Sequence, residues 1–472
     1  QPFRKTRKTQ EVRKSKAYII VILLFQSILI YGMSTTTNIK PLKVCIVGAG
    51  PAGLYLAHLL LKQDENVKID VLEKAPRKGT PDGNAFGFGV GSRHEKFLQE
   101  IPGLWHRIEA QSAPVTRLRI IGRNNLCQEM LAKLEEVDTK KRCCVSYETS
   151  CESIDTDQRV VTTTNGKEIN YDLLVGSDGV NSMVRKLLVE TKGLTEKRYL
   201  RNQFWKSLKL PKQAPNVLSP RDFKRLTHTS FKGAVFPRFP EGHAALVFWN
   251  DSCPQNPKGI ETTDDLIWAM TQAIQPKASK WEIAANVLFS GFGQNKASNT
   301  GEIRVEFDDD ECKRFVESKT RRENYIKLDR YHDTASRIAL VGDAAHGMYS
   351  LLGQGAACGF LTASLLAKSI QKAGGDIPTA LENYSAVAVP EGHAIADLNL
   401  LPHAIFGSLV AKLLSVPLLL MNALRGKLLL KRVNDDVTYQ QIYRENSLLV
   451  MVCRYFWKKD RVPFFDTKTK LA

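Results

Sequence analysis

A chain of 472 residues is long enough for two or more domains, and its apolar (43%) and charged (25%) fractions are those of an ordinary globular protein. The net charge of +18 would indicate a nucleic-acid partner if it lay on one folded face, but much of it lies at the two ends. Residues 1–16 carry seven Lys/Arg against one Glu, and residues 425–472 carry eleven against five Asp/Glu. We therefore expect no nucleic-acid partner, and the basic ends indicate either an anionic membrane surface or solvated tails.

The cysteine pattern excludes a disulfide or zinc framework. The nine cysteines are an odd number, are scattered along the chain and include no C-x-x-C pair. We expect no metal site and an intracellular, reducing compartment.

The first 40 residues form a basic and then apolar N-terminal extension. Ala17–Ile30 is an apolar run of 14 residues, broken only by Gln26-Ser27. A spanning helix needs about 20 residues, so this run fits a signal or weak anchor segment better. Alternatively, translation begins at Met33, and a protein without this extension follows. Both interpretations remain open at this stage.

A dinucleotide-binding pattern begins at Lys43. A predicted strand, Lys43–Val47, leads into the G-x-G-x-x-G turn of Gly48, Gly50 and Gly53, and a helix follows. A second predicted strand ends in Glu73, 20 positions after Gly53, where an acid is expected to bind ribose hydroxyls. A glycine motif alone is weak evidence, but this one lies in its strand–helix–strand context.

A second strand–turn–helix pattern lies between Ser336 and Ile370. A short β-type run, Arg337–Val341, ends at Gly342-Asp343, and after a glycine-rich turn a helical pattern begins. The Asp343 carboxylate would accept hydrogen bonds from sugar hydroxyls, and the backbone of the turn would receive phosphate or a ring edge. The competing interpretation is a buried corner whose glycines serve only packing.

Between the two patterns, Tyr171–Arg185 contains the dipeptide Asp178-Gly179. Together, the three motifs resemble those of the FAD-dependent aromatic hydroxylases, the single-component flavoprotein monooxygenases, and within that family especially the kynurenine 3-monooxygenases. The resemblance extends from Lys43 to about Leu400. It implies an α/β fold with a Rossmann-type FAD-binding domain, an interleaved sheet-and-helix substrate domain and a helical C-terminal part.

This resemblance also sets the expected domain boundaries. The FAD-binding domain comprises residues 41–200 and 331–380, the substrate domain residues 201–330, and the helical C-terminal region residues 381–472. Within the substrate domain, Thr263–Ile274 is predicted as a helix because Ile267, Met270 and Ile274 share one face. The glycine-rich stretch 85–91 is expected to pass along the flavin as extended backbone rather than as an ordinary strand.

The family's activity implies FAD as the bound cofactor, NAD(P)H as a transient co-substrate and O2 as the oxidant. The reaction would hydroxylate a small aromatic substrate, kynurenine-like at first guess, through a flavin C4a-hydroperoxide held out of water. Likeness to the kynurenine 3-monooxygenases would also imply peripheral or anchored membrane association, at the mitochondrial outer membrane. No catalytic residue is assigned, and His346 is expected to pack rather than to act as a base.

The family motifs point to a set of cofactor-binding residues: Gly48, Gly50, Gly53, Glu73, Arg123, Asp178, Gly179, Asp343, Gly353, Gln354 and Gly355. Arg185 would serve the FAD diphosphate or the NAD(P)H surface beside Asp178-Gly179.

Several positions depart from the kynurenine-hydroxylase pattern. The hairpin with an active-site tyrosine that should precede Arg123 is missing. Arg119 is the candidate substrate-binding residue, since guanidinium binds carboxylate bidentately, but a surface arginine is an equally good interpretation. Ser350 replaces a proline of the relatives, and Ala357 replaces an asparagine of their substrate site.

These departures leave two alternatives open. One is a membrane-associated flavin epoxidase or hydroxylase of an apolar substrate. The other is a flavin-binding protein without turnover, for which the missing hairpin is the best support.

Overall fold

The fold was analysed in a computed structural model. It describes residues 40–79, 87–115, 118–213, 218, 224–238, 240, 242–250, 254–274, 305–402, 409–427, 429–457 and 461–463. The predicted N-terminal extension lies outside the described residues, apart from Lys40. The account below concerns the compact unit Leu42–Ala472.

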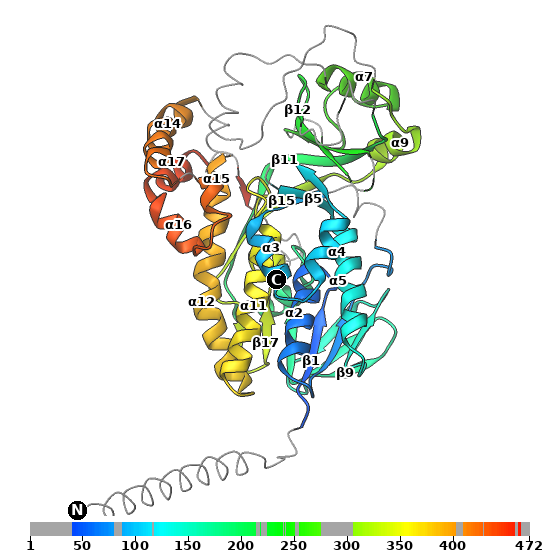
Figure 1. Cartoon of the computed structure of the whole chain (residues 1–472), viewed down its shortest axis with the longest axis vertical. Helices are drawn as coiled ribbons and strands as arrows, with labels where there is room; N and C mark the ends of the chain where they lie inside the picture. Colours follow the sequence, from blue (N-terminus) through cyan, green and yellow to red (C-terminus); the bar gives the residue numbers. More distant parts are fainter. Residues whose placement is uncertain are drawn as a thin grey trace, which may run out of the picture. The chain divides into compact units, whose positions relative to one another are not determined.

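A six-stranded, mostly parallel sheet forms the centre of the fold, in the order β16-β17-β10-β1-β2-β6 (Figure 1). Its strands are β1 (Lys43–Val47), β2 (Lys68–Leu72), β6 (Cys143–Ser146), β10 (Leu173–Gly176), β16 (His332–Asp333) and β17 (Ile338–Leu340). Apart from β16, which is antiparallel to β17, neighbouring strands are parallel. Strands from the start, the middle and the last third of the chain therefore meet with their carboxyl ends at one edge.

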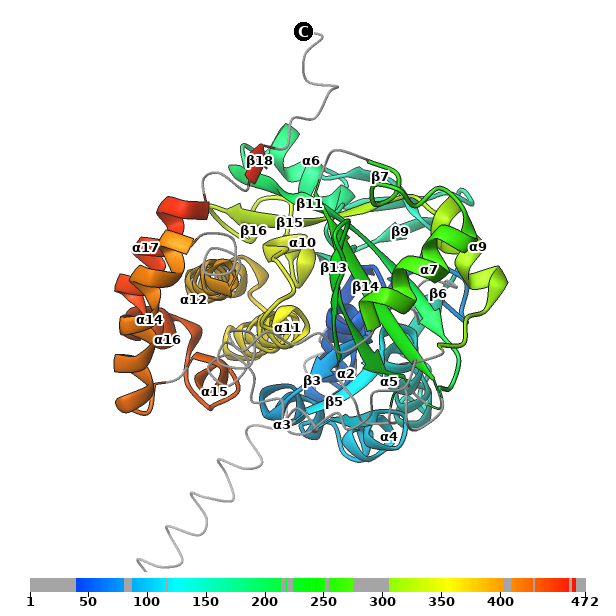
Figure 2. The same ribbon diagram turned by 90° about the horizontal axis from the view of Figure 1, so that it is seen from above.

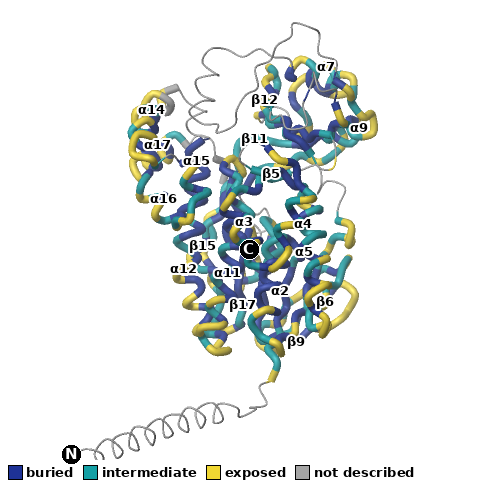
Figure 3. Tube along the Cα trace, in the orientation of Figure 1, coloured by how far each residue is buried: buried dark blue, intermediate teal, exposed yellow. Residues whose placement is uncertain are grey.

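Helices cover this sheet. α2 (Pro51–Gln63) contacts both α5 (Arg123–Val137) and α11 (Gly355–Lys372). All of these elements share one hydrophobic core, in which α2 and β17 are buried (Figure 3). β1 also contacts the small sheet of β7 (Cys151–Asp155), β8 (Val160–Thr163) and β9 (Glu168–Asn170). α6 (Met183–Thr191) and the single turn α10 (Asp343–His346) follow the ends of β10 and β17.

A second small sheet, in the order β3-β5-β4, precedes α5. Its strands are β3 (Gly87–Val90), β4 (Ala113–Val115) and β5 (Leu118–Gly122), and α3 (Ser92–Gln99) and α4 (Leu104–Ala110) lie between them in the chain. The expectation that the glycine-rich stretch forms no ordinary strand was wrong for Gly87–Val90. A Cβ at Gly87 would lie 2.8 Å from the Ile120 side chain, so its glycine makes room for the partner strand.

The third sheet is antiparallel, in the order β12-β13-β14-β11-β15, with β18 (Arg461–Pro463) beside β11. Its strands are β11 (Glu196–Leu210), β12 (Lys224–Thr227), β13 (Lys232–Pro237), β14 (His243–Trp249) and β15 (Arg321–Leu328). Helices α7 (Thr263–Ile274) and α9 (Asp309–Glu317) pack on one face of this sheet (Figure 2). The predicted helix Thr263–Ile274 is confirmed.

The C-terminal part is mostly helical, as predicted. Its helices are α12 (Ile377–Leu398), α14 (Leu409–Leu424), α15 (Leu429–Arg432), α16 (Tyr439–Glu445) and α17 (Ser447–Trp457). α16 packs against α12, and α14 packs against α17. In the described part of the chain, no helix has the length and apolar character that crossing a bilayer requires.

Asp397 of α12 joins three elements. Its carboxylate accepts a hydrogen bond from the Tyr325 hydroxyl (2.6 Å), pairs with Lys327 Nζ (2.8 Å) and also pairs with Arg454 of α17. The residue is only 2% exposed. The carboxylate therefore fastens both α12 and α17 to strand β15.

We expect Asp397→Asn to lower the free energy of unfolding by about 3 kcal/mol, because it leaves the half-buried Lys327 without its counter-charge. Urea denaturation followed by circular dichroism measures this change. Glu190→Gln is the matched control: it breaks a pair with Lys186 whose glutamate is 54% exposed, and should cost less than about 1 kcal/mol. Equal losses in the two variants would contradict the role of Asp397.

Candidate functional site

The glycine turn after β1 requires glycine for steric reasons. Gly48 has φ +106°, and a Cβ at this position would lie 2.6 Å from the Ser177 carbonyl oxygen. A Cβ at Gly53 would lie 2.2 Å from the Gly48 carbonyl oxygen. Helix α2 begins directly after Gly50, with no side-chain cap. Its first amides therefore remain available to an anionic ligand.

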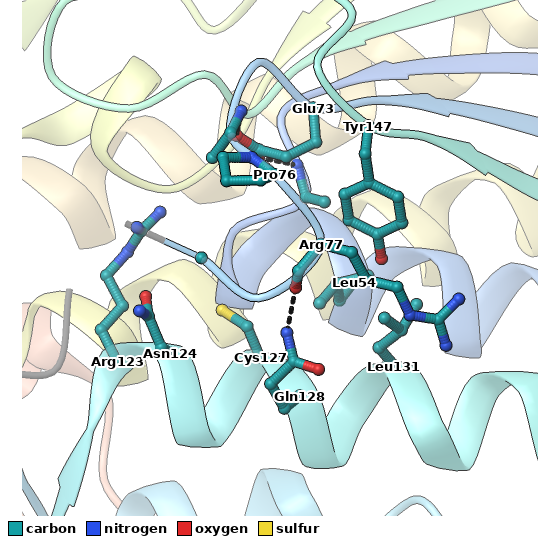
Figure 4. A pocket seen from close by; sticks show the side chains of 13 residues that line it. Leu54, Glu73, Pro76, Arg77, Arg123, Asn124, Cys127, Gln128, Leu131 and Tyr147 are labelled. Atoms are coloured by element: carbon teal, nitrogen blue, oxygen red, sulfur yellow. Dashed lines mark hydrogen bonds between the residues drawn. The ribbon is translucent and has the colours of Figure 1, made fainter. Parts of the chain in front are cut away.

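Glu73 follows β2 and borders a small cavity of about 50 Å³ that opens to solvent (Figure 4). Its two carboxylate oxygens accept hydrogen bonds from Ala49 N (2.9 Å) and Ala75 N (2.8 Å). Each oxygen retains a second lone pair for a ligand hydroxyl. The cavity wall combines apolar and polar side chains, among them Leu54, Cys127, Leu131, Tyr147, Arg77 and Asn124.

Arg123, the first residue of α5, lies beside both the glycine turn and Asp343. Its Nη2 is 3.3 Å from the position that a Cβ at Gly50 would take. Within the described part of the chain, no hydrogen bond is recorded for its guanidinium. Burial raises the pKa of Asp343, and the nearby charges of Arg123 and Arg185 oppose that shift. Asp343 is nonetheless an exposed residue, so a ligand can reach it from solvent.

The loop that carries Asp343 lies against the start of α2. A Cβ at Gly342 would lie 3.0 Å from the Ala52 Cβ, and one at Gly359 would lie 3.4 Å from the same atom. The two strand–turn–helix patterns, which are nearly 300 residues apart in the chain, thus meet at one place.

Asp178 and Gly179 adjoin the same turn, because β10 pairs with β1. The Asp178 Oδ2 accepts hydrogen bonds from Met183 N (2.7 Å) and Val184 N (3.3 Å), at the start of α6. Its Oδ1 is buried and has no hydrogen-bond partner among the described residues, and burial raises the pKa of this carboxyl. Asp178 therefore orders the start of α6 and retains one oxygen for a further donor.

Arg185 differs from expectation. Its side chain is buried, and it donates to Ala344 O (2.9 Å) and Val180 O (2.7 Å) and pairs with Glu196 (3.1 Å). These contacts hold the backbone of α10 and of the loop before α6. Arg185 therefore stabilises the backbone beside the site and does not itself line a nucleotide-binding surface.

Gly353, Gln354 and Gly355 form the turn that begins α11. Gly353 has φ +64°, and Gln354 is the N-cap residue, with no side-chain cap. The Gln354 Oε1 accepts a hydrogen bond from the Tyr439 hydroxyl (2.9 Å), and the Tyr439 ring lies 4.4 Å from the Arg93 guanidinium carbon. Sequence reasoning missed Tyr439 and Arg93, since no local pattern signals contacts over such separations in the chain.

Arg119 makes its hydrogen bonds with a different part of the chain. Its guanidinium donates to Ser112 Oγ (2.7 Å), Glu109 Oε1 (3.2 Å) and Glu109 O (2.9 Å), and so holds the end of α4. Its strand neighbours Leu118 and Ile120 pack against the antiparallel sheet. Side chains alternate along a strand, so Arg119 points away from that sheet. Its role as a substrate clamp stays a prediction.

The other departures from the kynurenine-hydroxylase pattern also lie in described parts of the chain. β5 ends at Gly122 and α5 begins at Arg123, so no hairpin separates them. Ala357 is fully buried in α11. Ser350 donates hydrogen bonds from its backbone N (2.9 Å) and its hydroxyl to the Glu323 carboxylate.

Comparisons with known proteins agree with this arrangement. The model of an NAD(P)-binding Rossmann-like domain matches residues 46–95. NADPH:adrenodoxin oxidoreductase of Drosophila melanogaster is 39% identical over 94 residues, which is 20% of this chain but only 18% of that protein. Kynurenine 3-monooxygenase of Phaeosphaeria nodorum is 23% identical over 398 residues, covering 76% of this chain and 77% of the relative.

Two solved structures have a similar fold. The tetrameric form of 2-methyl-3-hydroxypyridine-5-carboxylic acid oxygenase aligns with a TM-score of 0.55 and 18% identity, over 76% of this chain and 90% of that one. PqsL of P. aeruginosa, in complex with 2-aminobenzoylacetate, aligns with a TM-score of 0.54 and 19% identity, over 78% and 96%. The chain is similar to kynurenine 3-monooxygenases in sequence and to these two structures in fold. The predicted fold class and the predicted resemblance to the FAD-dependent aromatic hydroxylases are thereby confirmed.

We expect Gly53→Ala to destabilise the protein by about 3 kcal/mol, because the added methyl group has no room against the Gly48 carbonyl. Gly355→Ala is the contrasting variant, since a Cβ there meets nothing within 4 Å. It should leave folding unchanged or stabilise it by up to about 1 kcal/mol. Thermal unfolding distinguishes the two, and an unaffected Gly53→Ala protein would contradict the close approach.

His346 predicts a pH dependence of stability. It is fully buried, with Nε2 3.2 Å from Thr362 Oγ1, and burial lowers its pKa to about 4. In the unfolded chain the pKa is about 6.5, so between these values the unfolded state binds the extra proton and stability falls as the pH falls. Relative to His346→Gln, the native protein should lose up to about 1.4 kcal/mol more per pH unit in this window. Urea denaturation at several pH values measures the difference, and equal slopes would contradict the neutral imidazole.

Proposed function

We propose that this protein is an FAD-dependent monooxygenase that uses NAD(P)H and O2 to hydroxylate an aromatic substrate, with L-kynurenine as the first candidate. The observation that carries the proposal is the convergence of Glu73, Arg123, Asp343 and two uncapped helix starts on one place in the fold. This arrangement suits a ligand with sugar hydroxyls, a diphosphate and a flat ring.

The residues at this place fit FAD group by group. Glu73 would accept hydrogen bonds from the adenosine ribose, because each of its oxygens has a lone pair free. Arg123 and the first amides of α2 would hold the diphosphate. The exposed Asp343 carboxylate would take further hydroxyls, and the backbone of Gly353–Gly355 would lie along the flavin edge.

Bound FAD, reduced by NAD(P)H, would supply the activation of O2. The contribution of the protein is to position the substrate and to exclude water. Two aromatic side chains suit this role, since Phe248 of the antiparallel sheet and Tyr349 of the loop before α11 both lie beside the Arg201 guanidinium.

An aromatic acid is supported by the relatives as a substrate class. Kynurenine 3-monooxygenase of Phaeosphaeria nodorum resembles this chain over most of its length, and the similarly folded PqsL structure contains 2-aminobenzoylacetate. Ser350 and Ala357 are positions at which this chain differs from the kynurenine hydroxylases. The proposal of kynurenine as the substrate is therefore more specific than the proposal of an aromatic acid.

The test is the rate of NADPH oxidation by the purified, FAD-loaded protein, with and without L-kynurenine. We expect the substrate to raise this rate at least about tenfold, with hydroxylated product formed in place of peroxide, because substrate binding positions the reacting groups. The same assay with NADH identifies the preferred co-substrate.

Two results would contradict the proposal in different ways. A protein that holds FAD but responds to no aromatic acid would be a flavin-binding protein without turnover, or an enzyme for apolar substrates. A protein that takes up no FAD would overturn the cofactor site itself.

A further inference from the structure

The antiparallel sheet has one face covered by helices and another turned away from them. Leu208 and Val247 belong to the face that packs against α7 and α9. Trp205 pairs with Phe248 across the strands, and Arg321 pairs with Trp205 on the opposite side. These residues alternate with the packed ones, so they lie on the other face, which we call the inner face.

Arg201 of β11 contacts side chains of this inner face. Its guanidinium carbon lies 5.4 Å from the centre of the Phe248 ring and 6.0 Å from that of Tyr349. Its Nη1 pairs with Glu323 Oε2 at 2.5 Å, and the side chain is 15% exposed. No other hydrogen bond of this guanidinium is recorded among the described residues, so Nε and Nη2 remain available.

Glu323 connects Arg201 to the loop before α11. One carboxylate oxygen pairs with Arg201, and the other accepts hydrogen bonds from the backbone N and the hydroxyl of Ser350. A proline at this position could provide neither donor. Ser350 lies three residues before Gly353, so this network holds a cation close to the turn assigned to the flavin edge.

We infer that Arg201, held in position by Glu323, recognises the carboxylate of an aromatic acid substrate. The inference rests on the proposed function and assigns to Arg201 the role that was predicted for Arg119. Arg119 is less suited to this role because its guanidinium N–H groups already donate to Glu109 and Ser112, on the side of β5 turned away from the antiparallel sheet.

The chemistry of the site supports an anionic aromatic ligand. The free edge of a guanidinium binds a carboxylate through two parallel charge-assisted hydrogen bonds. The Phe248 ring, which is only half-buried, provides a surface on which an aromatic ring can pack. The Tyr349 ring is buried and supports the Arg201 side chain instead. Glu323 already accepts from Ser350 and Arg201, so it serves as a positioning residue rather than as a ligand for the substrate.

The test compares Arg201→Gln with Arg119→Gln in the full-length, FAD-loaded protein. Calorimetry measures the Kd for anthranilate and for its uncharged amide, and steady-state assays then separate KM from kcat. Loss of a charge-assisted contact should weaken anthranilate binding by about 10- to 100-fold in Arg201→Gln and leave amide binding unchanged. In Arg119→Gln, we expect the preference for acid over amide to persist.

Three outcomes would overturn the inference. These are a preference lost in Arg119→Gln but kept in Arg201→Gln, a preference kept in both variants, and an FAD-loaded native protein that shows no preference for the acid. If Arg201→Gln does not fold, Arg201→Lys provides the same test, because an ammonium keeps the charge but lacks the bidentate edge. A native protein that holds no FAD would instead refute the proposed function.

Discussion

The candidate site depends on the close approach of two backbone segments at the carboxyl edge of the parallel sheet. The turn after β1 runs so near Ser177 that only glycine fits at positions 48 and 53, and the Ser177 hydroxyl donates to the Gly48 carbonyl at 2.7 Å. Parallel pairing of β1 with β2 and β10 sets this geometry. It brings Glu73 and Asp178 to the start of α2, and the pairing of β17 with β10 adds Asp343.

The last third of the chain completes the site from outside this sheet. Arg93 of α3 donates to the carbonyls of Val433, Asp435 and Val437, and Glu391 of α12 accepts from Tyr439 N. The segment held in this way carries the Tyr439 hydroxyl to Gln354. The turn Gly353–Gly355 is therefore held by contacts from three separate parts of the sequence.

The sequence predicted the local parts of this structure well. The strand, glycine turn and helix at Lys43–Gln63 and the strand and helix around Asp343 depend on short-range patterns, and the structure has them. The features that were not predicted depend on contacts between residues far apart in the chain. The buried position of Arg185, the engagement of Arg119 by Glu109 and the link from Ser350 through Glu323 to Arg201 leave no periodic or local signal. The strand at Gly87–Val90 was missed because its glycines accommodate the side chains of its partner strand.

The central claim is that the site at Glu73 binds FAD rather than a nicotinamide nucleotide. A carboxylate at this position accepts hydrogen bonds from ribose hydroxyls and repels a 2′-phosphate. The most direct measurement is a competition experiment in which the purified protein is loaded with FAD and titrated with NADP+, which carries the 2′-phosphate but cannot reduce the flavin, and the released FAD is separated by filtration and quantified. The account predicts that FAD stays bound at saturating NADP+. Displacement of FAD by NADP+ would contradict it.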